Sequence, residues 1–426
     1  MHYSGSTVFK LTSAISRFKQ EQLLTSADKQ TLELLLKFYN VPKQELEGLS
    51  EPISVLDYFS EVILNDLKNI QISCDYDEYF NTMDIYYQEF VRAVFDIYED
   101  EGFITTHNHK KSLNYPLYSF KESAAKRLNE TRFTPRSAKT MVAESLKRLD
   151  TEWSFERTHS IGTRINEQTI DPMFDAEFLS IFNTIYPYLK KQNTNKSRLK
   201  TLLREFLYKM NNPNNDVSPA AGELYLKALE ILPADIFFVE RHLQNWVAKR
   251  TYAEVILLPS HLSTREYFFL GSITKNGRID SASKGYGMTL SQLAKEAGSE
   301  NTRLALLLSF GVSHRDYEWD STVEHVRRMM LQFNDFVNYL KKYKIKERPN
   351  RISDLLKSRN KEMEELIQRG NIRKILLIIF VELPRTIRSM LGTVPAMEKE
   401  NYEVLDFFSG WFEILCPSLK EKLYGN

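Results

Sequence analysis

Residues 279–319 constrain the fold of this chain more than any other stretch, because signals for a loop and two helices follow one another there without a gap. A polar loop that contains Gly285 and Gly287 opens the stretch. The pattern then predicts a helix over residues 291–297, a stop at Gly298 and a second helix over residues 302–309. We therefore expect a loop followed by a helix pair, with the rest of the chain organised around it.

The composition limits the class of protein. With 426 residues, of which 42% are hydrophobic, the chain is long enough for two or three domains with a substantial core, and a disordered protein is excluded. The longest apolar run starts at Ile375 and fits a buried helix better than a membrane span. No signal peptide is evident, so we expect a cytoplasmic protein. Cys74 and Cys416 supply neither a metal quartet nor a disulfide framework, and we expect both to be buried thiols.

Charge is unevenly distributed along a chain whose net charge is only +1. Residues 75–101 carry nine acidic side chains against one basic one, whereas residues 190–209 carry seven basic against one acidic, and residues 341–374 carry twelve against five. Basic segments of this density can neutralise phosphates, although a solvated helix face is the alternative interpretation. The candidate nucleic-acid-binding residues are Lys196, Arg198, Lys200, Arg351, Arg359, Arg373 and Lys374.

Motifs for catalysis are missing from the sequence. It shows no glycine-rich phosphate loop of its own, no metal-ligand cluster and no nucleophile paired with a base. Isolated histidines are interpreted as surface groups or as hydrogen-bonded core groups. We therefore predict no catalytic residue and no metal site.

Periodicity predicts a mostly helical α/β chain. Residues 30–105 and 304–424 have strong helical spacing of apolar side chains. Three short segments, at residues 235–239, 252–258 and 266–274, are rich in β-branched or aromatic residues and are predicted as strands. The parallel core is therefore expected to be small.

The loop, the helix pair, the run "AGSENTRLALL" and the closing Asp-x-x-Trp (Asp316 to Trp319) resemble the segment that follows the KMSKS loop of class I aminoacyl-tRNA synthetases. The resemblance is to leucyl-tRNA synthetase of the archaeal and eukaryotic cytosolic type. It implies a reduced Rossmann-like synthetase core over residues 1–301, with a helical insertion at about 30–105. It also implies a helical domain like an anticodon-binding bundle over residues 302–426.

The chain departs from that family at the places where the family handles ATP. The five residues aligned with the KMSKS motif are Ile279, Asp280, Ser281, Ala282 and Ser283, so both lysines of the motif are replaced, and Lys284 directly after them completes the degenerate loop. Asp280 would place a negative charge beside a polyphosphate. Ser4 and Gly5 lead directly into the first helix, without the family's histidine block. A polar linker at about 121–140 is expected where the family carries its editing domain.

The resemblance therefore implies a shortened, degenerate paralogue of leucyl-tRNA synthetase without an editing domain and without catalytic activity. The expected partner is tRNA or another translation component, with no cofactor and no membrane contact. Two alternatives remain open at this point. One is a trimmed, ATP-dependent leucine-tRNA ligase or amino-acid ligase, and the other is a protein-binding scaffold that binds no RNA.

Overall fold

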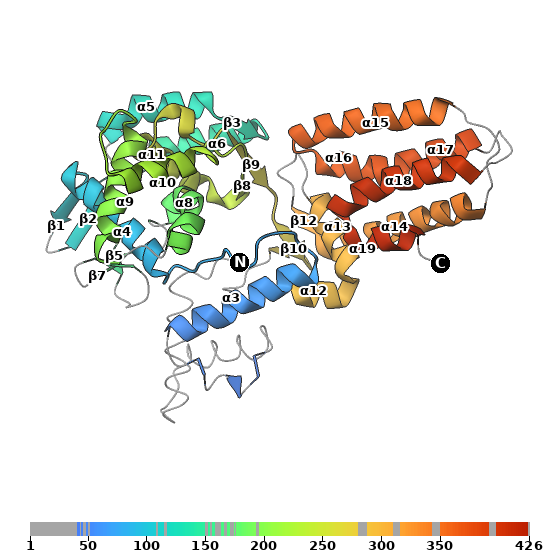
Figure 1. Cartoon of the computed structure of the whole chain (residues 1–426), viewed down its shortest axis with the longest axis horizontal. Helices are drawn as coiled ribbons and strands as arrows, with labels where there is room; N and C mark the ends of the chain where they lie inside the picture. Colours follow the sequence, from blue (N-terminus) through green and yellow to red (C-terminus); the bar gives the residue numbers. More distant parts are fainter. Residues whose placement is uncertain are drawn as a thin grey trace. The chain divides into compact units, whose positions relative to one another are not determined.

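The computed structural model describes residues 41–42, 44–45, 48–49, 52–107, 110–114, 117–149, 152–153, 156–157, 163–165, 168–170, 174, 176–192, 196–279, 288–309, 316–342, 350–391 and 398–424. The chain forms two units (Figure 1). Unit 1 comprises residues 1–63 and 74–269, and unit 2 comprises residues 64–73 and 270–426. Helix α3 (Pro52–Asn69) contributes to both units.

Helices make up most of unit 1. They are α4 (Ile85–Asp100), α5 (Leu117–Glu130), α6 (Ser137–Arg148), α8 (Leu179–Gln192), α9 (Lys196–Asn211), α10 (Pro219–Leu229) and α11 (Gln244–Leu257). Local side chains fix the starts of two of them, since Asp84 accepts a hydrogen bond from the Tyr86 amide at the start of α4 and Ser218 caps α10. Fully buried aromatic rings such as Phe90 and Phe182 fill the core between them. Burial of one such ring stabilises the fold by roughly 1.5–3 kcal/mol.

A three-stranded sheet forms the α/β element of unit 1. It has the order β3 (Arg132–Thr134), β9 (Glu266–Leu270) and β8 (Phe237–Glu240). Strands β3 and β9 pair in parallel, with Phe133 opposite Tyr267. No larger parallel sheet occurs among the residues described. The expectation of a reduced Rossmann-like core is thus confirmed.

Two expectations about this region are wrong. In the segment 252–258, expected as a strand, residues 252–257 form the second half of α11 and Leu258 follows the helix, and side chains of this segment pack into the core. The segment 121–140, expected as a linker, consists of the greater part of α5, all of β3 and the start of α6. It therefore supplies a strand of the core sheet instead of spanning a gap.

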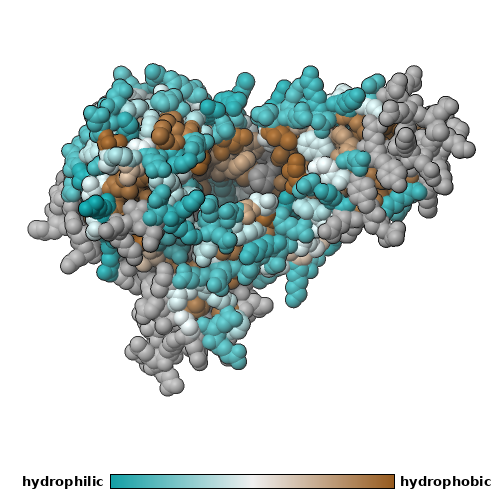
Figure 2. Space-filling view, in the orientation of Figure 1, coloured by the Kyte–Doolittle hydropathy of each residue, from teal (hydrophilic) through white to brown (hydrophobic). Residues whose placement is uncertain are grey.

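Two small sheets complete unit 1. One joins β1 (Ile104–His107), β2 (Lys110–Asn114) and β4 (Glu152–Trp153), and the other joins β5 (Glu156–Arg157), β7 (Gln168–Ile170) and β6 (Arg164–Ile165). The strands of both sheets pair antiparallel. On the face shown in Figure 2, hydrophilic residues cover most of the surface, with smaller hydrophobic patches between them.

The larger segment of unit 2, residues 270–426, starts with a short hairpin and continues as a helical bundle. The strands are β10 (Ile273–Lys275), β11 (Arg278–Ile279) and β12 (Tyr317–Glu318). The helices are α12 (Leu290–Ala297), α13 (Ser299–Ser309), α14 (Trp319–Lys342), α15 (Asn350–Gln368), α16 (Ile372–Leu377), the π-helical turn η7 (Ile378–Glu382), α17 (Leu383–Leu391), α18 (Glu398–Leu415) and α19 (Pro417–Tyr424). Helices α15, α16 and α18 run side by side (Figure 1).

The bundle core follows from the periodicity of α14. Val326, Met330, Phe333, Val337 and Leu340 recur at spacings of three and four and are all buried. Helices α12 and α13 bury side chains in this same core and therefore belong to unit 2. The chain divides after residue 269, whereas the resemblance implied a domain boundary after residue 301. No helix among the described residues is both long and apolar enough to cross a membrane.

Candidate functional site

The loop that resembles the KMSKS loop is bordered by β11 and α12 of unit 2. Of its six residues, Ile279 ends β11, whereas Asp280, Ser281, Ala282, Ser283 and Lys284 lie outside the described residues. The hairpin before the loop turns at Asn276 and Gly277, both with positive φ. Strand β10 pairs antiparallel with β11 and parallel with β12, which fixes the entry to the loop.

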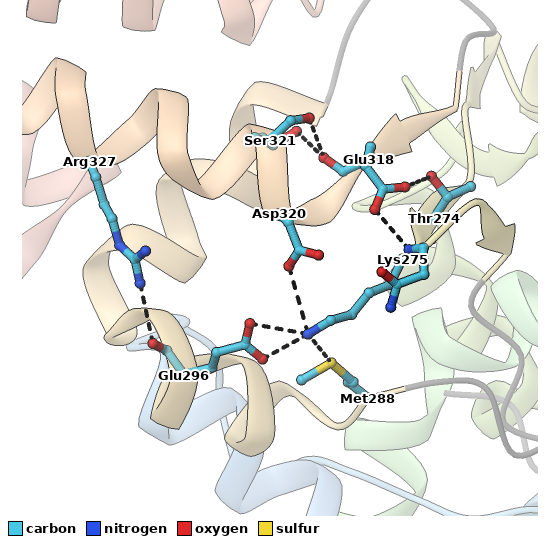
Figure 3. Close-up of polar contacts among 10 residues, drawn as sticks. Thr274, Lys275, Met288, Glu296, Glu318, Asp320, Ser321 and Arg327 are labelled. Carbon is cyan, nitrogen blue, oxygen red and sulfur yellow. Dashed lines mark hydrogen bonds and ion pairs between the residues drawn. The ribbon is translucent and has the colours of Figure 1, made fainter.

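Lys275 is the basic residue of β10, directly before the turn, and three side chains surround its ammonium group (Figure 3). Its Nζ lies 2.8 Å from the carboxylate of Glu296 and 3.8 Å from that of Asp320. It also lies 3.2 Å from the sulfur of Met288. Two carboxylates neutralise this charge, so a phosphate would have to displace them to bind Lys275.

Glu318 closes the hairpin from the other side. Its carboxylate accepts hydrogen bonds from the Thr274 hydroxyl at 2.7 Å and from the Asn276 amide at 2.9 Å (Figure 3). The bond from Thr274 is the main cause that lowers the pKa of Glu318 below its ordinary value. Glu318 therefore remains ionised and holds the turn by charge-assisted hydrogen bonds.

The start of α12 is fixed by a capping box and by α3. The Thr289 side chain accepts from the Gln292 amide, while the Gln292 side chain accepts from the Thr289 amide. Asp66 accepts a hydrogen bond from the Leu290 amide at 3.0 Å and another from the Ser291 hydroxyl. A carboxylate thus occupies the positive end of this helix, where an anionic ligand would otherwise be favoured.

Arg303 on α13 connects two helix ends within unit 2. Its guanidinium donates to the carbonyl oxygens of Ile70 at 3.0 Å and Gln71 at 2.6 Å, just beyond α3. It also donates to Ile414 at 2.8 Å and Leu415 at 2.6 Å, at the end of α18. The bonds to Ile414 and Leu415 satisfy carbonyls that the last turn of α18 leaves without internal partners, and the other two fix the chain just after α3.

A buried polar network lies between α11 and the core sheet of unit 1. The buried guanidinium of Arg250 lies 3.0 Å from the carboxylate of Glu254 and donates to the Tyr267 hydroxyl at 3.1 Å. Its carbon lies 4.7 Å from the ring centroid of Phe237 and 5.7 Å from that of Trp246. Burial raises the pKa of Tyr267 well above its ordinary value, so the phenol stays neutral in this network.

The predicted basic site on α9 is largely neutralised by α4, within unit 1. Lys200 lies 2.7 Å from Asp96, and Arg204 lies 3.4 Å from Asp96 and 2.5 Å from Asp100. Arg198 is exposed, and the side chain of Lys196 is outside the described part. The acidic segment 75–101 and the basic segment 190–209 therefore compensate each other.

Ion pairs also engage two of the predicted cations of unit 2. Glu382, on the π-helical turn, receives a hydrogen bond from Lys374 and lies 3.6 Å from Arg359. Arg359 lies 2.5 Å from Glu362 on its own helix. The side chain of Arg351 is not among those described.

Arg373 differs from these cations. Its side chain is exposed and makes no ion pair or hydrogen bond with a described residue. It borders a hollow of about 200 Å³ whose other lining residues are Leu308, Tyr317, Ser321, Thr322 and His325. No group of three or more His, Cys, Asp or Glu residues that could hold a metal ion occurs among the described residues.

The sequence did not single out four residues whose contacts organise this region: Lys275, Asp66, Arg303 and Glu382. The capping box at Thr289 was readable from the Thr-x-x-Gln pattern. The partners of Asp66 and Arg303 lie more than 100 residues away in sequence, and no local pattern announces them.

The fold relates the chain to solved synthetases. Two structures of Mycobacterium tuberculosis methionyl-tRNA synthetase with methionyl-adenylate match 99% and 98% of this chain, and 90% and 89% of theirs. Their TM-scores are 0.59 and 0.58, at 12% and 14% identity. The chain has a class I aminoacyl-tRNA synthetase-like fold, with a reduced core and a helical bundle.

Sequence comparison relates it more specifically to leucyl-tRNA synthetases, with weak and partial homology. The leucine-tRNA ligase of Archaeoglobus fulgidus is 32% identical over 88 residues, and that of Methanopyrus kandleri is 21% identical over 243 residues. The matches cover 21% and 55% of this chain, and 9% and 24% of those relatives' lengths. No family model matches the chain. The chain is therefore similar to leucyl-tRNA synthetases over less than a quarter of the length of these relatives.

Proposed function

We propose that this chain is a synthetase-like RNA-binding protein without aminoacylation activity, and that its ligand is tRNA or another RNA of the translation apparatus. The relatives named leucine-tRNA ligase support this class of ligand. The loss of both lysines from the KMSKS-like loop supports inactivity, because those cations would stabilise the charge that develops on ATP phosphates. The neutralisation of Lys275 by Glu296 and Asp320 supports it further.

Arg373 is the observation that carries the RNA proposal. The other predicted cations whose partners are known, Lys200, Arg359 and Lys374, lie beside carboxylates, and an RNA phosphate would have to displace those partners. Arg373 needs no such exchange. A guanidinium at the edge of a hollow can donate two hydrogen bonds to one phosphate.

The test is the salt dependence of binding of deacylated bulk tRNA to the full chain. Each phosphate contact contributes about 0.9 to the slope of log affinity against log salt. Arg373→Glu is expected to lower affinity about tenfold or more and to reduce this slope by about one. Arg328→Glu is the matched control, since Arg328 is an exposed arginine of unit 2 that does not line the hollow.

Two results would overturn the proposal. One is binding that does not respond to salt. The other is an equal effect of the two reversals, which would indicate a diffuse effect of net charge instead of a site at Arg373. If the chain captures protein partners without RNA and does not bind tRNA, the alternative of a protein-binding scaffold is favoured.

A further inference from the structure

Another hollow of unit 2, with a volume of about 600 Å³, lies between α15 and α18. On α15 it is lined by residues at spacings of three and four between Ser353 and Glu364, and on α18 it is lined by Phe407. Residues at these spacings share one face of a helix, so the hollow follows α15 for roughly three turns. It is therefore a groove along the helix, and we call it the α15–α18 groove.

The α15–α18 groove offers apolar surface to a ligand. Phe407 is only partly buried, and its ring lies edge-on to the buried ring of Phe408, with 5.6 Å between the two centroids. The methylene stems of Lys357 and Lys361 add apolar surface on the α15 side, because a lysine can bury its stem while its ammonium group stays in water. The groove thus has apolar walls with charged groups at its rim.

Apolar side chains continue beyond the groove on both helices. Ile367, three residues after Glu364, is 40% exposed, and Ile414, seven residues after Phe407, is 63% exposed. Offsets of three and seven residues keep side chains on the same helix face. A ligand longer than the groove would therefore find further apolar contacts along the same two helices.

The charges at the rim are divided between two parts of the groove. Lys357 and Lys361 are exposed, lie one helical turn apart and make no ion pair or hydrogen bond within the described part of the chain. Glu364 borders the later part, where its carboxylate accepts a hydrogen bond from the Asn360 amide at 2.7 Å. The Asn360 side chain also accepts from the Trp411 indole at 3.1 Å, which connects it to α18. The groove is positive in its first part and negative where it ends.

This combination selects one class of ligand. A nucleic-acid backbone is negative along its whole length, so a strand that passes both lysines would also meet the carboxylate of Glu364. An amphipathic helix can carry acidic residues in its first turns and basic residues in its last turns, and its own macrodipole favours that order. Its apolar side chains at i, i+3, i+4 and i+7 can enter a groove between two helices.

We propose that the α15–α18 groove binds an amphipathic helix of a partner protein. The acidic first turns of the partner lie over Lys357 and Lys361, its apolar face contacts Phe407, and its basic last turns lie near Glu364. The inference goes beyond the proposed function, because it assigns a protein partner to a surface that shares no lining residue with the hollow at Arg373.

A displayed library of helical peptides of about 18 residues, or five turns, tests the charge pattern. Each peptide keeps leucine at i, i+3, i+4 and i+7, while the flanking positions vary among Glu, Lys and Gln. Selection on the full chain should enrich Glu in the first half and Lys in the second. Selection on the double variant Lys357→Glu with Lys361→Glu should instead enrich Lys in the first half. No enrichment above display without protein, or the same charge pattern from both proteins, would overturn the inference.

An enriched peptide is then titrated with the full chain by fluorescence anisotropy. The double variant Lys357→Glu with Lys361→Glu should weaken its binding about tenfold or more, because two attractions become repulsions. The matched control is Lys295→Glu with Arg328→Glu, which changes the net charge equally at exposed residues outside the groove. It should weaken binding less than about twofold, since salt screens distant exposed charges. Equal effects of the two double variants would overturn the inference.

Deacylated bulk tRNA distinguishes a protein partner from RNA in this groove. Unlabelled peptide should displace the labelled peptide, whereas tRNA should not. Displacement by tRNA would assign the groove to RNA and overturn the inference. Peptide binding that depends on Lys357 and Lys361, in a chain that does not bind tRNA, would support the groove and reject only the proposed function. Thermal melts establish that the variants, all changed at exposed residues, retain the fold.

Discussion

The ammonium group of Lys200 lies 2.7 Å from the carboxylate of Asp96, which joins α9 to α4 inside unit 1. With Arg204 beside the same carboxylate, the pair belongs to a small network across the two helices. Partly exposed pairs of this kind contribute modestly to stability, and more when several charges act together. The basic character of α9 thus serves the helix packing of unit 1.

A double-mutant cycle measures this contribution. The single changes Lys200→Ala and Asp96→Ala should each destabilise unit 1, with a coupling free energy of about 0.5–1 kcal/mol in urea denaturation. The pair Arg148 and Glu144 is the control, because its atoms lie 3.7 Å apart on side chains that are 80% and 58% exposed. A coupling free energy near zero between Lys200 and Asp96 would mean that this pair does not stabilise the packing of α9, and α9 would again be a candidate RNA-binding surface.

Arg303 should be one of the most sensitive polar residues of unit 2. Arg303→Ala removes donors from four carbonyls at two helix ends and is expected to lower the free energy of unfolding by at least about 2 kcal/mol. Arg303→Lys should restore only part of this loss, because one ammonium cannot reach both pairs of carbonyls. Arg327→Ala is a control of similar size, since Arg327 makes only a long 3.4 Å hydrogen bond to the Glu296 carbonyl and a 4.0 Å ion pair with Glu324 on its own helix. Equal effects of the two alanine changes would contradict the assignment.

The hairpin before the loop should respond to acid through Glu318. Its pKa is lowered in the folded state, so its contribution to stability is present above the unfolded-state pKa and is lost as pH falls through the folded value. Thr274→Val removes the main cause of the shift. The variant should have a higher Glu318 pKa in an NMR titration and should begin to lose stability at a higher pH.

Thr322→Val is the matched control for this titration. The Thr322 hydroxyl donates to the backbone carbonyl of Glu318 at 2.8 Å and does not contact its carboxylate. The pKa of Glu318 should therefore stay lowered in this variant. A pKa that moves equally in both variants would assign the shift to something other than the Thr274 hydroxyl.

The two cysteines should differ in reactivity, contrary to the expectation that both are buried. Cys74 is exposed, whereas Cys416 is buried and its pKa is raised by burial. A thiol-specific reagent should therefore modify about one thiol per native chain, and Cys74→Ser should abolish this reaction. Cys416→Ser should leave it unchanged. Rapid modification of both thiols without denaturant would contradict the burial of Cys416.

Local signals account for what the sequence predicted well. Thr289 as a cap, Gly298 with φ 87° as a stop, and the apolar spacing of α14 are all encoded within a few residues of where they act. Strand β3 was missed because it has only three residues, and its identity depends on pairing with β9, over 100 residues away. The β-branched Val255 and Ile256 suggested a strand, but burial of α11 against the core outweighs that propensity.

In the candidate site, too, some features are visible in the sequence and others depend on the fold. The absence of lysines at 279–283 is visible in the sequence, and so is the basic excess around Arg373. Which cations already have carboxylate partners depends on helix packing. Glu382 contacts Lys374 on the preceding helix and Arg359 on a neighbouring one, and only the folded bundle brings these three together.

The last prediction concerns the reaction of leucyl-tRNA synthetases. The loop aligned with KMSKS has no lysine at residues 279–283, and Lys275 is held by Glu296 and Asp320. Loss of such cations removes several kcal/mol of transition-state stabilisation, and each 1.36 kcal/mol costs about tenfold in rate. Leucine-dependent exchange of pyrophosphate into ATP should therefore not exceed a control without protein, while an archaeal leucine-tRNA ligase in the same buffer should show rapid exchange. Exchange clearly above the blank, abolished by omitting leucine, would instead establish the ATP-dependent ligase alternative.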